Sequence, residues 1–163
     1  MKKIELIIII IVFFISCNKK QINFNELEER NGVYYEIEKQ KPFTGKSREY
    51  YKSGQLQEEG TFKNGILEGP YKKYYTNGKL YSKVTYKNGK KEGPYKSYFE
   101  NGQLAEKGTY KNNKLDGLLK RYYMEGQLWE EETYENGIYV ESKRHYEIRR
   151  KSYWNWSNKV LTI

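Results

Sequence analysis

The sequence is short of the residue types that most often build catalytic and metal-binding sites. It has one cysteine, Cys17, and one histidine, His145, in 163 residues. A single cysteine excludes a disulfide framework within the chain, and so few thiols and imidazoles exclude a standard zinc site. With no interpretable nucleophile–base set and no phosphate-binding loop, we expect no catalytic, cofactor-binding or metal-binding residues. The sequence therefore predicts a protein that is not an enzyme and has no small-molecule substrate.

Aliphatic residues are also scarce, whereas tyrosine is abundant. Hydrophobic residues make up 37% of the chain, and 18 tyrosines bring the aromatic share to 17%. This balance gives little material for a deep core but many side chains with an apolar body and a polar tip. It predicts a thin or elongated structure, and the aromatic content argues against disorder in the middle of the chain.

Basic residues are not spread evenly. The net charge is +9, but residues 46–141 carry 17 basic against 14 acidic side chains, while residues 142–163 carry six against one. The positive excess is therefore mostly C-terminal, whereas a nucleic-acid-binding surface usually distributes basic residues along its length. We expect no nucleic-acid partner. The C-terminal segment is predicted either to cap the last hairpin with its aromatic residues or to contact an anionic membrane surface.

The N-terminus reads MKKIELIIIIIVFFISC. Lys2 and Lys3 precede an unbroken apolar run of ten residues, which is typical of a secretory signal peptide and short for a membrane span of about 20 residues. The run ends at Phe14, Ile15, Ser16 and Cys17, which resemble a bacterial lipobox. The resemblance implies cleavage before Cys17, acylation of its thiol and amino group, for example with palmitate, and anchoring to a membrane of the cell envelope. An outer-membrane or surface location is compatible with Asn18 at the next position. The alternative is an uncleaved membrane helix.

A 24-residue period runs through the middle of the chain. Leucine, threonine and two glycine positions keep this interval over four copies without insertion or deletion. Such a period is the signature of a repeat architecture whose units stack on one another. The positions are Gly45, Gly69, Gly93, Gly117; Gly54, Gly78, Gly102, Gly126; Thr61, Thr85, Thr109, Thr133; and Leu56, Leu80, Leu104, Leu128.

Each copy contains two turn signals, such as Asn77-Gly78 and Asn88-Gly89. Asn-Gly between alternating stretches predicts a two-residue type I′ hairpin turn, and Asn113 replaces the glycine in one copy. With this turn at 77–78, Tyr75 would face Leu80, Tyr74 would face Tyr81, and Tyr71 would face Val84. The same arithmetic pairs Phe99 with Leu104 and Tyr123 with Leu128.

The phrase YYxNGxL…TYxNGxxxG resembles the variant MORN (membrane occupation and recognition nexus) repeat, and the chain is similar to bacterial proteins of the YwqK-type antitoxin family. The resemblance covers residues 43 to about 141, and Glu141 departs from it where glycine is expected. It implies an all-β fold, an elongated twisted antiparallel meander of hairpins, that serves as a scaffold for an unknown protein partner or a lipid surface. The alternative that it implies is an antitoxin or immunity-type protein that neutralises a partner toxin.

We therefore divide the chain into a signal peptide (1–16), a lipidated cysteine with a tether (17–26), a degenerate capping repeat (27–45), four repeats (46–141) and a basic, aromatic cap or tail (142–163). The aromatic residues that the predicted pairing directs away from the core are the candidate interaction face. They are Tyr50, Tyr74, Tyr81, Tyr98, Tyr122 and Trp129.

Overall fold

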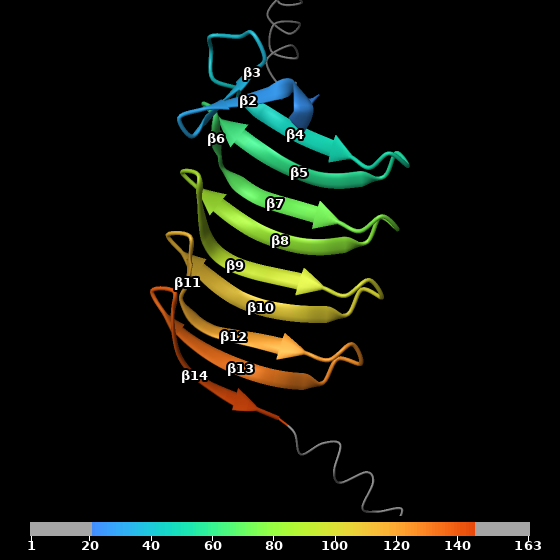
Figure 1. Ribbon diagram of the computed structural model, residues 1–163, viewed down its shortest axis with the longest axis vertical. Helices are drawn as coiled ribbons and strands as arrows, with labels where there is room; N and C mark the ends of the chain where they lie inside the picture. Colours follow the sequence, from blue (N-terminus) through green and yellow to red (C-terminus); the bar gives the residue numbers. More distant parts are fainter. Residues whose placement is uncertain (1–20, 146–163) are drawn as a thin grey trace, which may run out of the picture.

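The repeats form one long antiparallel sheet, whose strands succeed one another along the axis of the molecule (Figure 1). The structure, a computed structural model, describes residues 21–145. The path through the main sheet is β1-β4-β5-β7-β8-β9-β10-β12-β13-β14, and β2 and β3 form a separate hairpin. The predicted all-β meander is therefore confirmed. The elements are β1 (Gln21–Asn23), the 3-10 helix η1 (Phe24–Glu26), β2 (Leu27–Arg30), β3 (Val33–Glu36), β4 (Gly45–Tyr50), β5 (Leu56–Lys63), β6 (Ile66–Leu67), β7 (Gly69–Tyr74), β8 (Leu80–Lys87), β9 (Lys90–Tyr98), β10 (Leu104–Lys111), β11 (Lys114–Leu115), β12 (Gly117–Tyr122), β13 (Leu128–Glu135) and β14 (Ile138–Arg144).

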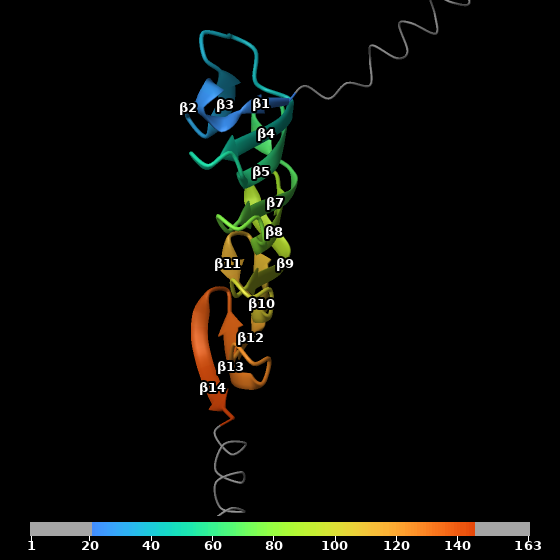
Figure 2. The same ribbon diagram turned by 90° about the vertical axis from the view of Figure 1, so that its right-hand side faces the viewer.

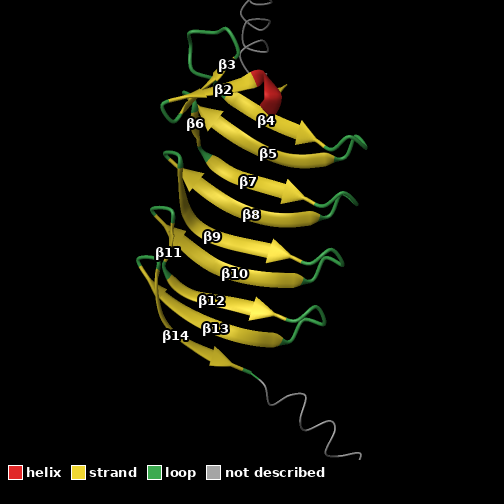
Figure 3. Ribbon diagram, viewed as in Figure 1, coloured by secondary structure: helices red, strands yellow, loops and turns green. Residues whose placement is uncertain are grey.

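The sheet is a narrow single layer when it is turned by 90° (Figure 2). Turns and loops lie at both ends of the strands, so that each copy contributes a hairpin and a return connection (Figure 3). A single layer can bury few side chains completely. Accordingly, the buried apolar side chains of residues 21–145 are limited to Phe43, Phe62, Val84 and Leu119. None of the helices in this part of the chain has the length and apolar character needed to span a bilayer.

An aromatic cluster closes the N-terminal end of the sheet. Phe62 is 1% exposed, and its ring centroid lies 5.7 Å from Phe24, 5.0 Å from Tyr34 and 5.9 Å from Phe43. Phe24 belongs to η1 and Tyr34 to β3, so the segments before the repeats cover the first hairpin. Residues 21–26, which we expected in a tether, are thus part of the fold, and β1 pairs in parallel with β4.

Gly65 joins this cap to the first repeat. Its amide donates to the Phe43 carbonyl at 2.7 Å, and its own carbonyl accepts from the Tyr34 amide at 2.8 Å. Its φ is +75°, and a Cβ at this position would lie 2.4 Å from Val33 Cγ1. The close backbone approach and the left-handed conformation both require glycine here.

The Asn-Gly turns at one end of the strands have the predicted type I′ conformation. In Asn88-Gly89, φ is +50° and +74°, and Lys87 pairs directly with Lys90. Asn112-Asn113 adopts the same conformation, with φ of +50° and +69°. Asparagine tolerates positive φ better than other non-glycine residues, which explains why it replaces glycine there. The remaining turns of this kind are Asn31-Gly32, Asn64-Gly65 and Asn136-Gly137.

The prediction of a two-residue turn at 77–78 is wrong. Gly78 has a φ of +79°, but Asn77 is not left-handed. The Tyr75 amide donates to the Lys79 carbonyl at 2.8 Å and the Gly78 amide to the Tyr75 carbonyl at 2.9 Å, which defines a three-residue loop. The Asn77 side chain stabilises it by accepting from the Lys79 amide at 2.9 Å.

This longer loop changes the pairing near its tip. Tyr74 lies opposite Leu80, so the predicted pairs Tyr75–Leu80 and Tyr74–Tyr81 are wrong. A β-bulge at Tyr81 then restores the register, and Tyr71 faces Val84 as predicted. The other copies need the same correction: Tyr98, not Phe99, pairs with Leu104, and Tyr122, not Tyr123, pairs with Leu128.

Neighbouring repeats are linked by hydrogen bonds to the type I′ turns at residues 88–89 and 112–113. The Asn88 amide donates to the Glu68 carboxylate at 2.8 Å, and the Gly89 amide donates to the Leu67 carbonyl at 3.0 Å. The Asn112 amide and the Glu92 carboxylate form the equivalent bond at 2.9 Å. Each turn is therefore stabilised by the copy that precedes it.

A tyrosine hydroxyl makes a second link between neighbouring repeats, at the end of the strands where the three-residue loops lie. Tyr75 Oη donates to the Tyr98 carbonyl at 2.7 Å, and Tyr51 Oη donates to the Tyr74 carbonyl at 2.7 Å. The equivalent residue of the third copy is Phe99, which has no hydroxyl with which to bond Tyr122. The sequence thus contains a natural comparison between a linked and an unlinked pair of repeats.

We predict that Tyr75→Phe lowers the free energy of unfolding by about 1 kcal/mol, because one partly buried hydrogen bond between repeats is lost. Conversely, Phe99→Tyr should raise it by about 0.5–1 kcal/mol, since the new hydroxyl can reach the Tyr122 carbonyl. Urea unfolding followed by circular dichroism measures both. Tyr81→Phe is the control, because the Tyr81 side chain is 45% exposed. Equal effects of the Tyr75 and Tyr81 variants would contradict the proposed link.

Candidate functional site

Lysine and tyrosine side chains share one face of the sheet, which we call the open face. Strand alternation places Lys72 and Tyr74 of β7 on the same side. Both bind the same carboxylate: Lys72 Nζ and Tyr74 Oη each lie 3.0 Å from Glu59 Oε1 on the neighbouring hairpin. The opposite face, which we call the packed face, carries Phe62, Tyr71, Val84 and Leu119.

A line of charged residues crosses the open face from strand to strand. Directly paired positions run through successive strands without a break, both within hairpins and between them. The order is Arg48, Glu59, Lys72, Lys83, Lys96, Lys107, Lys120, Glu131 and Lys143. We call the five central residues, Lys72 to Lys120 in this order, the lysine row.

The ends of the lysine row are neutralised. Lys72 pairs with Glu59, which also accepts from Arg48 Nε at 3.3 Å. At the other end, Lys120 Nζ lies 2.5 Å from Glu131 Oε1, and His145 Nε2 lies 3.2 Å from the other oxygen of Glu131. The cation at each end of the row therefore has a carboxylate partner.

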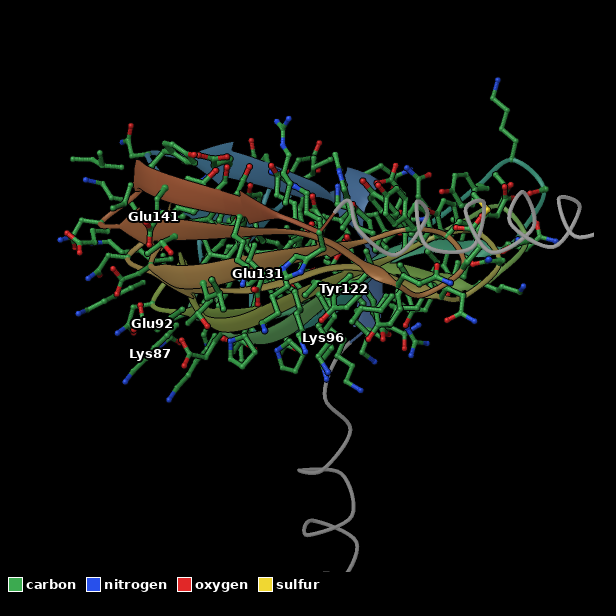
Figure 4. All side chains as sticks on the ribbon, turned by 90° about the horizontal axis from the view of Figure 1, so that it is seen from below. Lys87, Glu92, Lys96, Tyr122, Glu131 and Glu141 are labelled. Atoms are coloured by element: carbon green, nitrogen blue, oxygen red, sulfur yellow. The ribbon has the colours of Figure 1, made fainter. Side chains whose placement is uncertain are left out.

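The middle of the row is different. Lys83, Lys96 and Lys107 are exposed and make no ion pair within residues 21–145. Each lies directly opposite another lysine on both sides, and strands are about 4.8 Å apart. Figure 4 shows Lys96 and Glu131 midway along the strands, whereas Lys87 and Glu92 lie at their turn end. The open face thus concentrates three uncompensated positive charges at its centre.

Beside the lysine row lies a tyrosine row, made of one residue from the end of the first strand of each copy. It consists of Tyr50, Tyr74, Tyr98 and Tyr122, which are four of the six predicted interaction residues. Tyr50 is 44% exposed and the other three are half-buried. Lys107 Nζ lies 5.6 Å from the centroid of the Tyr122 ring, so the two rows contact each other. Tyrosine is one of the residues enriched at protein-binding surfaces.

The other two predicted residues, Tyr81 and Trp129, occupy the bulges. Tyr81 packs against Tyr75 with ring centroids 5.1 Å apart, and Trp129 packs against Tyr123 at 6.0 Å. The structure therefore separates them from the tyrosine row. The two-residue turn that we assumed had placed Tyr81 opposite Tyr74.

The carboxylates at repeat positions on the packed face belong to an ion-pair network. Arg121 bonds Glu106 at 3.0 Å, Glu130 at 3.2 Å and Glu132 at 2.5 Å. Glu130 is 3% exposed and also accepts from Arg144 Nε at 2.7 Å. These groups hold β10, β12, β13 and β14 together.

The pKa values of these acids follow their partners. The hydrogen bond from Arg144 lowers the pKa of Glu130, and the hydrogen bond from Lys120 lowers the pKa of Glu131. Partial burial opposes the change at Glu59, but hydrogen bonds from Lys72 and Tyr74 lower its pKa overall. On the packed face, burial and then the hydrogen bond to Glu58 raise the pKa of Tyr71 well above its usual range.

Several sequence predictions fall outside the structure described. Cys17 and the lipobox residues Phe14, Ile15 and Ser16 lie in residues 1–20, and most of the basic, aromatic tail lies in residues 146–163. Between these segments, no three His, Cys, Asp or Glu residues are grouped so that they could hold a metal ion. His145 is half-buried beside Glu131.

The sequence reasoning missed the lysine row. Neither Lys83 nor Lys107 was singled out in the sequence analysis. The available signal was their place in the period: the equivalent residue is Glu59 in the first copy and Glu131 in the fourth. Aligning the copies would have shown acidic residues in the outer copies and basic ones in the inner copies. It would not have shown which strands bring them together.

We predict that the protein loses stability in acid because three carboxylates have lowered pKa values. A folded-state pKa below the unfolded value stabilises the fold above about pH 4.3, and this contribution is lost as pH falls through the folded value. The melting temperature should therefore drop between about pH 5 and pH 3. Glu130→Gln should lower stability at pH 7 and flatten this acid dependence. Glu125→Gln, at an exposed loop, should retain the wild-type slope; the same slope in both variants would contradict the assignment.

Comparison with known proteins agrees with this architecture. A family model of the MORN repeat variant matches residues 43–64, 67–88, 91–112 and 115–136, each of which spans a hairpin and ends at the first residue of the return turn that follows it. Neither curated proteins nor solved structures gave a match. The four consecutive matches cover more than half of the chain, and the period, turns and sheet follow the same boundaries. The chain therefore belongs to the MORN repeat variant family.

Proposed function

We propose that this protein is a non-enzymatic scaffold, anchored to a membrane of the bacterial cell envelope by a lipid on Cys17, that binds a protein partner on its open face. The observation that carries the proposal is the tyrosine row. Four tyrosines occupy equivalent positions on β4, β7, β9 and β12, two strand spacings apart, or about 10 Å. They form a regular surface that the single-layer sheet leaves accessible.

The chemistry of this row supports protein binding. Tyrosine offers a large contact area and a hydrogen-bonding tip at a small cost in conformational entropy, and it is enriched at binding hot spots. The rings are held in place, since Tyr74 bonds Glu59 and Tyr122 contacts Lys107. A partner would thus meet a preorganised surface.

A crosslinking pull-down from the native envelope tests the proposal. Tyr98→Ala combined with Tyr122→Ala should reduce recovery of the crosslinked partner at least about tenfold, as expected when two hot-spot residues are removed. Tyr81→Ala combined with Trp129→Ala is the matched control, because it removes two aromatic residues that lie at the bulges. Equal recovery with both double variants would overturn the open face as the binding surface. A captured toxin that the protein inhibits would assign the antitoxin role that the family resemblance implies.

The lipid anchor is tested separately. Cys17→Ser should abolish labelling with an alkyne analogue of palmitate and release the protein from the membrane fraction, because the only thiol of the chain is removed. In the control, Cys17→Ser is combined with Ser53→Cys, which restores one thiol at an exposed loop. This variant should also remain unlabelled. Persistent labelling of the Cys17→Ser protein would contradict a lipid on Cys17.

A further inference from the structure

The lysine row is not required by the repeat. Each copy contributes two residues to the charged line across the open face. The second of these is Glu59, Lys83, Lys107 and Glu131 in the four successive copies. The two glutamates form ion pairs with their cross-strand neighbours Lys72 and Lys120. The fold therefore accommodates glutamate at this position and gains an ion pair from it. Lysine at positions 83 and 107 needs another explanation.

Lys83 and Lys107 lower the stability of the sheet when no ligand is bound. Lys83 faces Lys72 and Lys96, and Lys107 faces Lys96 and Lys120. Like charges directly opposite each other on neighbouring strands are destabilising. A negatively charged ligand over the row would convert this repulsion into attraction.

We infer that the lysine row binds an acidic segment of a partner protein, laid across the strands of the open face. The inference rests on the proposed function and adds the chemistry of the partner. The acidic segment would contact the lysines, while neighbouring residues of the partner would reach the tyrosine row alongside. Two residues along a strand separate the rows, a distance of about 7 Å.

The ends of the row define the size of this ligand. Five lysines span four strand spacings, or about 19 Å, which an extended peptide of about six residues covers. Beyond them, Glu59 and Glu131 stand in place of lysine and neutralise Lys72 and Lys120, so the uncompensated positive charge does not extend past the row. This arrangement favours a short acidic segment over a continuous anionic surface or a long polyanion.

The tyrosines beside the row also favour a polypeptide over a nucleic acid. Base stacking needs an accessible ring face. Lys107 occupies one face of Tyr122, and the hydroxyl of Tyr74 is fixed to Glu59. The Tyr122 ring therefore offers a base less free surface than an unoccupied ring would.

The test uses Lys83→Glu combined with Lys107→Glu, which gives the inner copies the residue that the outer copies already carry. The matched control is Lys87→Glu combined with Lys111→Glu. It changes the net charge equally, its lysines flank the return turns, and the fourth copy already carries Glu135 at this position. Full-length protein in a neutral detergent is titrated with fluorescein-labelled octaglutamate at low salt.

The wild type and the control should bind octaglutamate equally, and binding should weaken as salt screens the charges. The Lys83/Lys107 variant should bind at least about tenfold more weakly, because two attractive charges become repulsive. It should nevertheless melt at the same or a higher temperature, which distinguishes loss of the site from loss of the fold. Equal weakening in both variants would overturn the inference. Stronger binding of oligothymidylate or of phosphatidylglycerol vesicles than of octaglutamate would also overturn it.

Failure of this inference and failure of the proposed function are distinguishable. If the pull-down recovers a partner equally well with the Lys83/Lys107 variant, the scaffold function stands and the acidic-segment inference is wrong. If octaglutamate binds the row but the tyrosine variants have no effect on the pull-down, the row binds acidic peptide and the proposed function is wrong.

Discussion

The structure depends on hydrogen bonds that each repeat supplies to the next. A single-layer sheet buries few side chains, so a hairpin of this kind has little stability by itself. The Glu68 carboxylate and the Leu67 carbonyl accept the amides of the following Asn88-Gly89 turn, and Tyr75 reaches the carbonyl of Tyr98. The turns at Asn88, Asn112 and Asn136 are each hydrogen-bonded to an acidic side chain of the copy before them. Because these bonds join residues 20 to 23 apart, they tolerate no insertion within a copy, which accounts for the strict 24-residue period.

How much of this could be predicted from the sequence depended on how local each feature is. The type I′ turns were predictable because Asn64, Asn88, Asn112 and Asn136 are always asparagine at a position that needs positive φ. At the other end of the strands the equivalent residues are Ser53, Asn77, Asn101 and Glu125. Glutamate is unfavourable at positive φ, so the variation itself indicates that only the following glycine is left-handed.

The lysine row was beyond local reasoning for a different reason. The turn of a hairpin predicts which residue of the same hairpin lies opposite Lys83. It does not predict which residue of the following hairpin lies on the other side of Lys83. Between β8 and β9 the register shifts by two residues before Val84 pairs with Tyr95. Gly93, with a φ of +93°, lies in this irregular stretch. Without the shift, Lys83 would lie opposite Pro94 instead of Lys96, and no continuous row would form. The decisive feature of the open face thus depends on a backbone irregularity that the turn rules do not describe.

The period also makes the open face extendable in whole units. Each copy adds two strands, or about 10 Å of sheet, and each of these strands adds one residue to the charged line. Duplication of an inner copy would lengthen the run of positive charge by two and leave its acidic ends unchanged. Duplication of an outer copy would instead insert an acidic residue. The number and order of copies therefore determine the length and the charge of the open face. Duplication of a copy in the gene can thus change the range of ligands without a new fold.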